Sequence, residues 1–281
     1  MENFRPFVRY ARKNEHRILP WRVQAVDHRL FYCHSGNGSC EISGKLYLLS
    51  PGTAIYIPAG VPYILRFNEE PTVLSGCNFD FYRDHIMLNE PIPPVPEGKF
   101  QETDILEKQI FPKEHIFANA IHLENAFTLE YKFLEIADEF QKHSLYWDAY
   151  CSALIHGLII HLAQLYQTRK MGVDDAKGNA ILRYIHAHYQ QPLSNGDIAA
   201  HFGYHAYYIS ALVRKFTGLP LHRYLLRYRM HSAVSLLQTT SLSVSKVAAT
   251  VGMPDVKHFS KCFKNVMGVP PSTFRSSFLK E

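Results

Sequence analysis

The sequence predicts an α+β protein of several domains: an antiparallel β-barrel, a helical hairpin and an all-α C-terminal domain with two helix-turn-helix units. Three observations lead to this fold class. Residues 29–82 form short apolar runs broken by Gly and Pro, as in small antiparallel barrels or sandwiches. Between residues 127 and 167 apolar residues recur at helical spacing. The C-terminal third contains one helical sequence pattern twice.

The barrel is expected within residues 1–100. Its strands would be short, because turn sequences interrupt the apolar runs at residues 35–38, 43–44, 50–52 and 58–60. The 281 residues, of which 47% are hydrophobic, suffice for two domains that each bury a core.

Residues 101–170 are expected to form the helical hairpin. Its first helix shows an apolar series from Phe127 through Tyr131 to Leu134, and its second runs from 147 to 167. The second helix has more apolar surface than one small barrel needs to cover, at Leu154, Leu158, Ile159, Leu162 and Leu165. This surface predicts a homodimer interface, although packing within the chain explains it equally well. Residues 171–178 have little apolar content and are expected to be a flexible linker that ends the N-terminal part.

Residues 179–281 contain the repeated sequence pattern. Residues 198–203 recur as 247–252, and Ser210, Arg214, Gly218 and Pro220 recur as Ser260, Lys264, Gly268 and Pro270. Each copy has the pattern of a short helix, a tight turn with Gly and a longer helix, the arrangement that inserts one helix into a DNA major groove. The longer helices are expected at 205–216 and 254–267, with Tyr208 and Cys262 facing the core and Pro254 in the first turn.

The charge distribution agrees with binding to nucleic acid. Residues 179–281 hold twelve Lys and Arg against three Asp and Glu, whereas residues 1–178 hold eighteen against twenty-two. The net charge of +5 therefore conceals a strongly basic C-terminal third. Such a region can neutralise phosphates, although a solvated basic helical surface would have the same composition.

Composition also excludes several classes of protein. The first residues lack the apolar core of a signal peptide, and the longest apolar stretch is interrupted by His156 and His161, so a cytoplasmic protein without membrane association is expected. The five cysteines are scattered without zinc-site or disulfide spacing and are expected to be reduced thiols. No metal or cofactor is expected.

Residues 193–275 resemble the DNA-binding domain of the AraC/XylS family of bacterial transcription regulators. The resemblance rests on motifs at fixed spacing: Ile198-Ala199, Gly203, Phe216-Thr217-Gly218, Arg229, Ala233, Val247-Ala248, Val251-Gly252, His258-Phe259-Ser260, Phe263-Lys264, Gly268, Pro270-Pro271-Ser272 and Phe274-Arg275. It implies that both longer helices enter successive major grooves on one face of the duplex.

The resemblance also implies which residues read bases. The family's base-reading positions correspond to Tyr207, Ser210 and Ala211 in the first unit and to Lys257, His258 and Lys261 in the second. Arg214 and Lys264 follow on the same outward faces, where Lys264 is expected to reach a phosphate. Because Ala211 can contact only a thymine methyl, we expect more polar base readout from the second unit.

The N-terminal half resembles a cupin barrel, and the predicted barrel is therefore cupin-like. Gly52, Pro58-Ala59-Gly60 and Tyr63 have the spacing of the second cupin motif, with Tyr63 at the place where enzymatic cupins have a metal-binding His. The first motif's His pair is missing from residues 36–41. A phenol with a pKa near 10 is a poor metal ligand, so metal catalysis is not expected.

This half also resembles, less specifically, the small-molecule sensing domain of AraC-like regulators. The candidate effector-binding residues are polar or amphipathic side chains on or beside the predicted strands: Arg22, Tyr32, His34, Tyr56 and Tyr63. An Arg can grip a carboxylate or hydroxyl pair, and aromatic rings can lie against a sugar. For each of these residues taken alone, an ordinary half-buried barrel position is the more common explanation.

The sequence as a whole is therefore interpreted as a transcription regulator without enzymatic activity. We expect it to bind double-stranded promoter DNA, to respond to a small metabolite such as a sugar, and to form a homodimer, with RNA polymerase as a further candidate partner. The alternative is a cupin-type enzyme that acts on a small molecule and carries a DNA-binding module.

Overall fold

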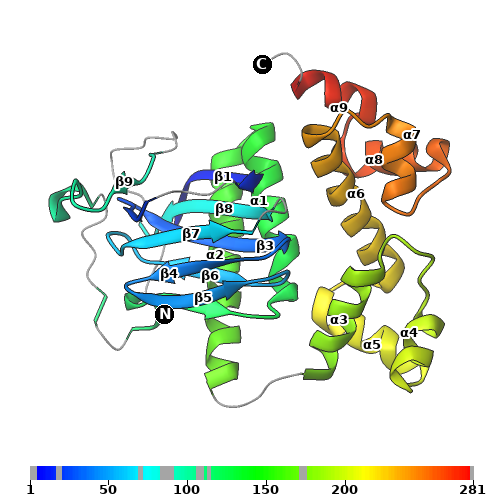
Figure 1. Cartoon of the computed structure of the whole chain (residues 1–281), viewed down its shortest axis with the longest axis horizontal. Helices are drawn as coiled ribbons and strands as arrows, with labels where there is room; N and C mark the ends of the chain where they lie inside the picture. The colour runs from blue at the N-terminus through cyan, green and yellow to red at the C-terminus, as the bar shows by residue number, and fades with distance from the viewer. Residues whose placement is uncertain are drawn as a thin grey trace. The chain divides into compact units, whose positions relative to one another are not determined.

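The computed structural model describes residues 5–16, 21–68, 72–82, 92–105, 111–112, 115–170 and 176–278. The chain divides into two compact units, Met1–Asp174 and Asp175–Glu281. The N-terminal unit contains antiparallel β-sheets and a pair of helices, and the C-terminal unit is helical (Figure 1). This agrees with the predicted α+β class. Of the expected linker 171–178, residues 171–175 lie outside the described residues, and residues 176–178 already belong to a helix.

Two antiparallel sheets of five strands form the N-terminal unit, and Figure 1 shows them layered. The first, sheet A, has the order β1 (Phe7–His16), β8 (Thr72–Asp80), β3 (His28–Ser35), β6 (Ala54–Ile57), β10 (Ile121–Leu123). The second, sheet B, has the order β5 (Lys45–Leu49), β4 (Gly38–Ile42), β7 (Tyr63–Phe67), β2 (Val23–Gln24), β9 (Val95–Pro96). The predicted turn sequences connect these strands.

Sheet A is buried on both faces. Successive side chains of a strand point to opposite faces, and β3 separates its residues accordingly. Phe31 and Cys33 join the core between the sheets. Leu30 and Tyr32 join a second core on the other face. The fully buried pattern of β3 and β8 follows from this position between two layers.

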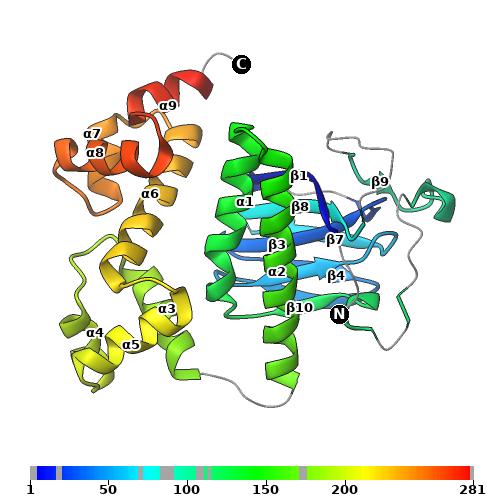
Figure 2. The ribbon, with the colours of Figure 1, turned by 180° about the vertical axis from the view of Figure 1, so that it is seen from behind.

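Helices α1 (Glu130–Lys142) and α2 (Trp147–Lys170) cover the second face of sheet A (Figure 2). Short 3₁₀ segments precede them at Glu102–Asp104, Ile116–Ala118 and Phe127–Leu129. Helix α2 is long and apolar enough to cross a membrane, with a mean hydropathy of 1.3 in its most apolar window. Its buried residues Cys151, Ile155 and Leu158 pack in the core with sheet A, as in a core helix of a folded domain.

Two leucines expected at a dimer interface are part of this core. Leu158 and Leu162 are both 0% exposed and pack with sheet A and α1. The interpretation that they form a free apolar face is therefore wrong. The reason is that the helix-facing side of sheet A is largely apolar and covers these leucines, which strand periodicity alone did not reveal.

The described part of the C-terminal unit is helical. In chain order its helices are α3 (Ala176–His188), α4 (Asn195–Phe202), α5 (Ala206–Thr217), α6 (Leu221–Thr239), α7 (Val244–Thr250), α8 (Val256–Met267) and α9 (Pro271–Phe278). Residues of α6, α7 and α8 share one core. Helix α3 starts before residue 179, where the C-terminal region was expected to begin. Pro254 precedes the N-cap of α8, Asp255, and so does not lie in the first helical turn.

Two glycines at equivalent places in the repeat yield a testable difference. Gly203 and Gly252 both have a left-handed backbone, with φ of 67° and 78°. A Cβ on Gly252 would lie 2.3 Å from the Gln190 carbonyl oxygen, whereas nothing lies within 4 Å at Gly203. Gly203→Ala should therefore cost only the backbone term of about 1–2 kcal/mol. Gly252→Ala should cost about 1–3 kcal/mol more, because main-chain atoms must move.

Urea unfolding of the two full-length variants, followed by helical circular dichroism, measures this difference. Equal losses of stability would contradict the close approach of Gly252 to Gln190.

Candidate nucleic-acid interface

The first helix pair, α4 and α5, is held by local capping. The Ser194 hydroxyl accepts from the Asp197 N–H, and the Asp197 carboxylate accepts from the Ser194 N–H at 2.7 Å, which completes a capping box. These hydrogen bonds hold the pKa of Asp197 below its usual value. Gly203 ends α4 in the left-handed conformation, and the His205 ring caps α5 by accepting from the Tyr207 N–H. Gly203 and His205 thus define the turn between the two helices.

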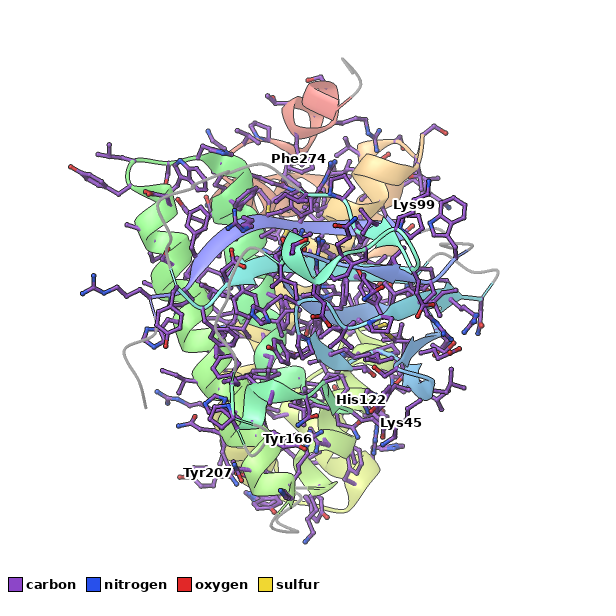
Figure 3. The ribbon with its side chains drawn as sticks, turned by 90° about the vertical axis from the view of Figure 1, so that its left-hand side faces the viewer. Lys45, Lys99, His122, Tyr166, Tyr207 and Phe274 are labelled. Atoms are coloured by element: carbon purple, nitrogen blue, oxygen red, sulfur yellow. The ribbon has the colours of Figure 1, made fainter. Side chains whose placement is uncertain are left out.

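One face of α5 is buried and the other is open. Ile209, Leu212 and Val213 lie in the core. Among the residues expected at DNA, Tyr207 (labelled in Figure 3) is 79% exposed, Ala211 and Arg214 are exposed, and Ser210 is half-buried. Tyr208 was expected to face the core but is 40% exposed, with its ring edge-on to Tyr204. Its position one residue before Ile209 places it at the margin of the buried face.

The second pair, α7 and α8, repeats this design with a stronger contrast between its faces. Ser243 caps α7, and the Asp255 carboxylate caps α8 by accepting from the N–H groups of Lys257 and His258 at 2.9 and 3.0 Å. Phe259, Phe263 and Met267 are buried. The outward residues, all exposed, are Lys257, His258, Lys261 and Lys264.

Helix α6 connects the two pairs and is joined to α3. The Arg229 guanidinium donates to the carbonyl oxygens of Tyr189 and Gln191, each at 2.7 Å. Nearer the N-terminus of α6, the Tyr224 hydroxyl lies 2.6 Å from His186 Nε2 of α3. Met230 and Ala233 of α6 enter the core of the second pair. Helix α6 is therefore fixed both to α3 and the residues that follow it and to the core of the second pair.

The open faces offer hydrogen-bond donors and positive charge. Lysine and arginine contribute donors only, and histidine contributes a donor and an acceptor when neutral. The face of α8 has three lysines, whereas the face of α5 has Arg214. Phosphates and the acceptor atoms of base edges are the chemical groups that such a surface can bind. Within the described ranges, no group of three or more His, Cys, Asp and Glu side chains could hold a metal ion.

The contact between His258 and Cys262 was not predicted. Cys262 was assigned to the core, but it is half-buried and its sulfur lies 3.4 Å from His258 Nε2. The two residues are four apart on one helix, and this spacing is the signal in the sequence that would have found them.

The five residues expected to bind an effector do not converge on one pocket. Tyr63 lies in the core between the sheets, and burial raises the pKa of its phenol to about 12. Arg22, the residue before β2, pairs with Glu41 and Glu97. Tyr32, His34 and Tyr56 belong to the other side of sheet A. Strand alternation separates the predicted set into different layers.

Tyr56 and Tyr32 have structural contacts on the helical side. The Tyr56 hydroxyl lies 2.9 Å from His28 Nδ1 and donates to the Phe117 carbonyl oxygen at 3.1 Å. The Tyr32 ring packs against Phe133 of α1, with ring centroids 5.3 Å apart. Both side chains are fully buried.

His34 connects sheet A to α1 through a buried polar chain. Its Nε2 lies 2.7 Å from the Ser75 hydroxyl and its Nδ1 lies 3.1 Å from the Glu130 carboxylate. The order of groups is that of a hydrolase triad. However, Ser75, His34 and Glu130 are 1%, 6% and 4% exposed, so this serine is not presented to a substrate. The chain of hydrogen bonds instead anchors the first turn of α1 to β3 and β8.

Comparisons with known proteins place this helical surface in context. A family model described as a helix-turn-helix domain matches residues 198–277. The chain is similar to the HTH-type transcriptional activator AarP of Providencia stuartii, with 37% identity over 97 residues, 34% of this chain and 72% of that protein. It is also similar to the Msm operon regulatory protein of Streptococcus mutans, with 36% identity over 97 residues, 34% of this chain and 35% of the relative.

A weaker similarity extends over both units. The HTH-type transcriptional activator RhaS of Enterobacter sp. is 24% identical over 248 residues, 82% of this chain and 84% of the relative. The match to the Msm operon protein, by contrast, spans only about a third of that relative. The motifs of the repeat, the matching helix-turn-helix model and the similarity to AarP lead to one conclusion: the chain belongs to the AraC/XylS family of transcription regulators.

Proposed function

We propose that this protein is a sequence-specific, double-stranded-DNA-binding transcription regulator. In this proposal α4–α5 and α7–α8 are two helix-turn-helix units, and α5 and α8 enter successive major grooves. The observation that carries the proposal is the outward face of α8, where Lys257, His258, Lys261 and Lys264 are exposed opposite a buried phenylalanine face. The basic composition of the unit supplies the electrostatic attraction to phosphates.

The two helix-turn-helix units make different kinds of contact with DNA in this proposal. On α5, Tyr207 and Ala211 suit apolar contacts such as a thymine methyl, Ser210 adds one hydroxyl, and Arg214 reaches the backbone. On α8, Lys257, His258 and Lys261 point donors at base edges, and Lys264 reaches a phosphate. Sequence preference should therefore be sharper in the half of the site that α8 contacts.

A small metabolite is the proposed controller, and the two sheets are the proposed cupin-type sensing barrel. The similarity to RhaS, which extends through both units, supports a shared architecture. Among the five candidate residues, Tyr63 is the one whose side chain lies between the sheets. Arg22 is already paired with carboxylates outside that core, so we assign it no effector contact. A sugar as the effector stays a prediction.

The helical hairpin is the proposed dimerisation element. Leu145, Tyr146 and Tyr150, at and after the α1–α2 turn, are 84%, 74% and 46% exposed. Apolar side chains gathered on a surface commonly mark protein contacts. RNA polymerase as a partner and a cytoplasmic location belong to the same proposal.

An enzyme is the alternative from another class. The relatives are named regulators, and burial keeps the phenol of Tyr63 protonated, so this residue lacks the anionic form that binds metals well. Metal analysis of the purified protein tests the alternative, since stoichiometric iron, manganese or zinc would support it.

Lysine variants of α8 test the DNA contacts. Lys261→Ala should weaken binding and relax base preference at one or two positions, by about 1–3 kcal/mol. Lys264→Ala should weaken binding to all duplexes alike and reduce the slope of log K against log salt by about 0.9. Titrations with selected and scrambled duplexes at several salt concentrations measure both effects. Equal, sequence-independent losses would refute base contact by Lys261.

A hydroxyl deletion tests the sensing site. If the effector lies between the sheets, Tyr63→Phe should abolish the rise in melting temperature that the metabolite causes in the full-length protein. Arg22→Ala is the matched control and should retain it. Ligand at a hundredfold excess over Kd stabilises the wild type by about 2.7 kcal/mol. A metabolite response that survives Tyr63→Phe places the effector elsewhere.

Two sets of variants separate the core of the hairpin from its surface. Tyr150→Lys should shift the protein from dimer to monomer while it stays folded. Leu158→Lys with Leu162→Lys should abolish folding, because unpaired charges are costly to bury. Sedimentation and circular dichroism distinguish the results. A wild-type protein that is monomeric at micromolar concentration would rule out the dimer.

A further inference from the structure

The two outward helices differ at one pair of positions beyond the lysines. The repeat aligns Ser210 with Ser260, so that His258 and Cys262 of α8 correspond to Tyr208 and Leu212 of α5. In α5 this pair is an aromatic ring at the surface and a buried aliphatic residue, 40% and 7% exposed. In α8 it is a polar pair in mutual contact. The second unit therefore has a side-chain interaction that the first lacks.

The geometry of α8 brings the imidazole and the thiol together. The Asp255 carboxylate fixes the backbone of His258 by accepting from its N–H at 3.0 Å. Helical side chains lean toward the N-terminus, so Cys262, one turn later, leans toward His258. The resulting separation of 3.4 Å between Cys262 Sγ and His258 Nε2 is within hydrogen-bond range for sulfur.

The direction of this hydrogen bond follows from the state of the thiol. Burial raises the pKa of Cys262, and the neighbouring Lys261 opposes this only in part. The side chain is therefore a protonated S–H donor at neutral pH. When S–H donates to Nε2, the neutral imidazole carries its own hydrogen on Nδ1. That Nδ1–H points away from Cys262 and is left to donate to another molecule.

We propose that Cys262 is a positioning residue for DNA recognition: its thiol holds His258 in the Nδ1–H form, which donates to a purine N7 in the major groove. The inference rests on the proposed DNA-binding function. Each base pair has one purine, and N7 is the major-groove acceptor that adenine and guanine share. His258 thus distinguishes a purine from a pyrimidine on one strand at one position. This specificity belongs to the α8 half of the site.

The test combines three variants with modified DNA. A duplex selected from random sequence by the full-length protein is rebuilt with 7-deazapurines, which lack N7, at one position at a time. One such position should weaken wild-type binding about three- to tenfold, the range expected for one neutral hydrogen bond. His258→Ala should be insensitive to that substitution. Cys262→Ala should have reduced sensitivity, whereas Cys262→Ser, which keeps a donor, should retain it.

A second readout needs no DNA. In protein labelled with ¹⁵N-histidine, the signal absent from His258→Ala identifies His258 and shows which ring nitrogen carries the hydrogen. Cys262→Ala should move hydrogen from Nδ1 to Nε2, and Cys262→Ser should not. Melting temperatures of the three variants show whether α8 remains folded.

The outcomes distinguish the role of Cys262 from the proposed DNA binding. Failure of the wild type to select any duplex would refute the proposed DNA binding, while the tautomer measurement would still test the role of Cys262. Binding that responds to 7-deazapurines equally in wild type and Cys262→Ala, with an unchanged tautomer, would overturn the positioning role. A His258 ring with its hydrogen on Nε2 in the wild type would overturn it as well.

Discussion

The burial of one face of α8 is the constraint on which the candidate interface depends. Phe259, Phe263 and Met267 occupy the core, and the 3.6-residue period of the helix then directs the side chains between them outward. Because Phe259 and Phe263 are buried, Lys257, His258 and Lys261 lie on the opposite, exposed side of the helix. A charge placed at 259 or 263 would remove both the core and the orientation of the lysines.

The other contacts of the C-terminal unit maintain this orientation. Asp255 fixes where α8 begins, and Gly252 allows the preceding turn to approach the main chain at Gln190. Arg229 gathers the carbonyl oxygens at the end of α3 onto α6, whose Met230 and Ala233 lie under α8. Local caps and a few long-range hydrogen bonds thus determine the direction in which the lysines of α8 point. A small change in the caps or in these hydrogen bonds would reorient the lysines.

The N-terminal unit follows a different principle, because sheet A is enclosed between two layers. Its alternate side chains serve two cores, and polar side chains that face the helices must be satisfied there. His34 meets this need by linking Ser75 to Glu130, and Tyr56 by bonding His28 and the Phe117 carbonyl. These residues hold the hairpin on the sheet.

The sequence by itself determined the family, the α+β class and the outward lysines of α8, since these depend on local periodicity, turn residues and spacing. Only the tertiary structure decided that Leu158 and Leu162 face sheet A, that Tyr32, His34 and Tyr56 lie apart from Tyr63, and that Cys262 contacts His258. The physical reason is that the periodicity of a strand or helix shows which of its faces is apolar, but not which other segment packs against that face. Which layer covers which face is decided by contacts between segments far apart in the chain.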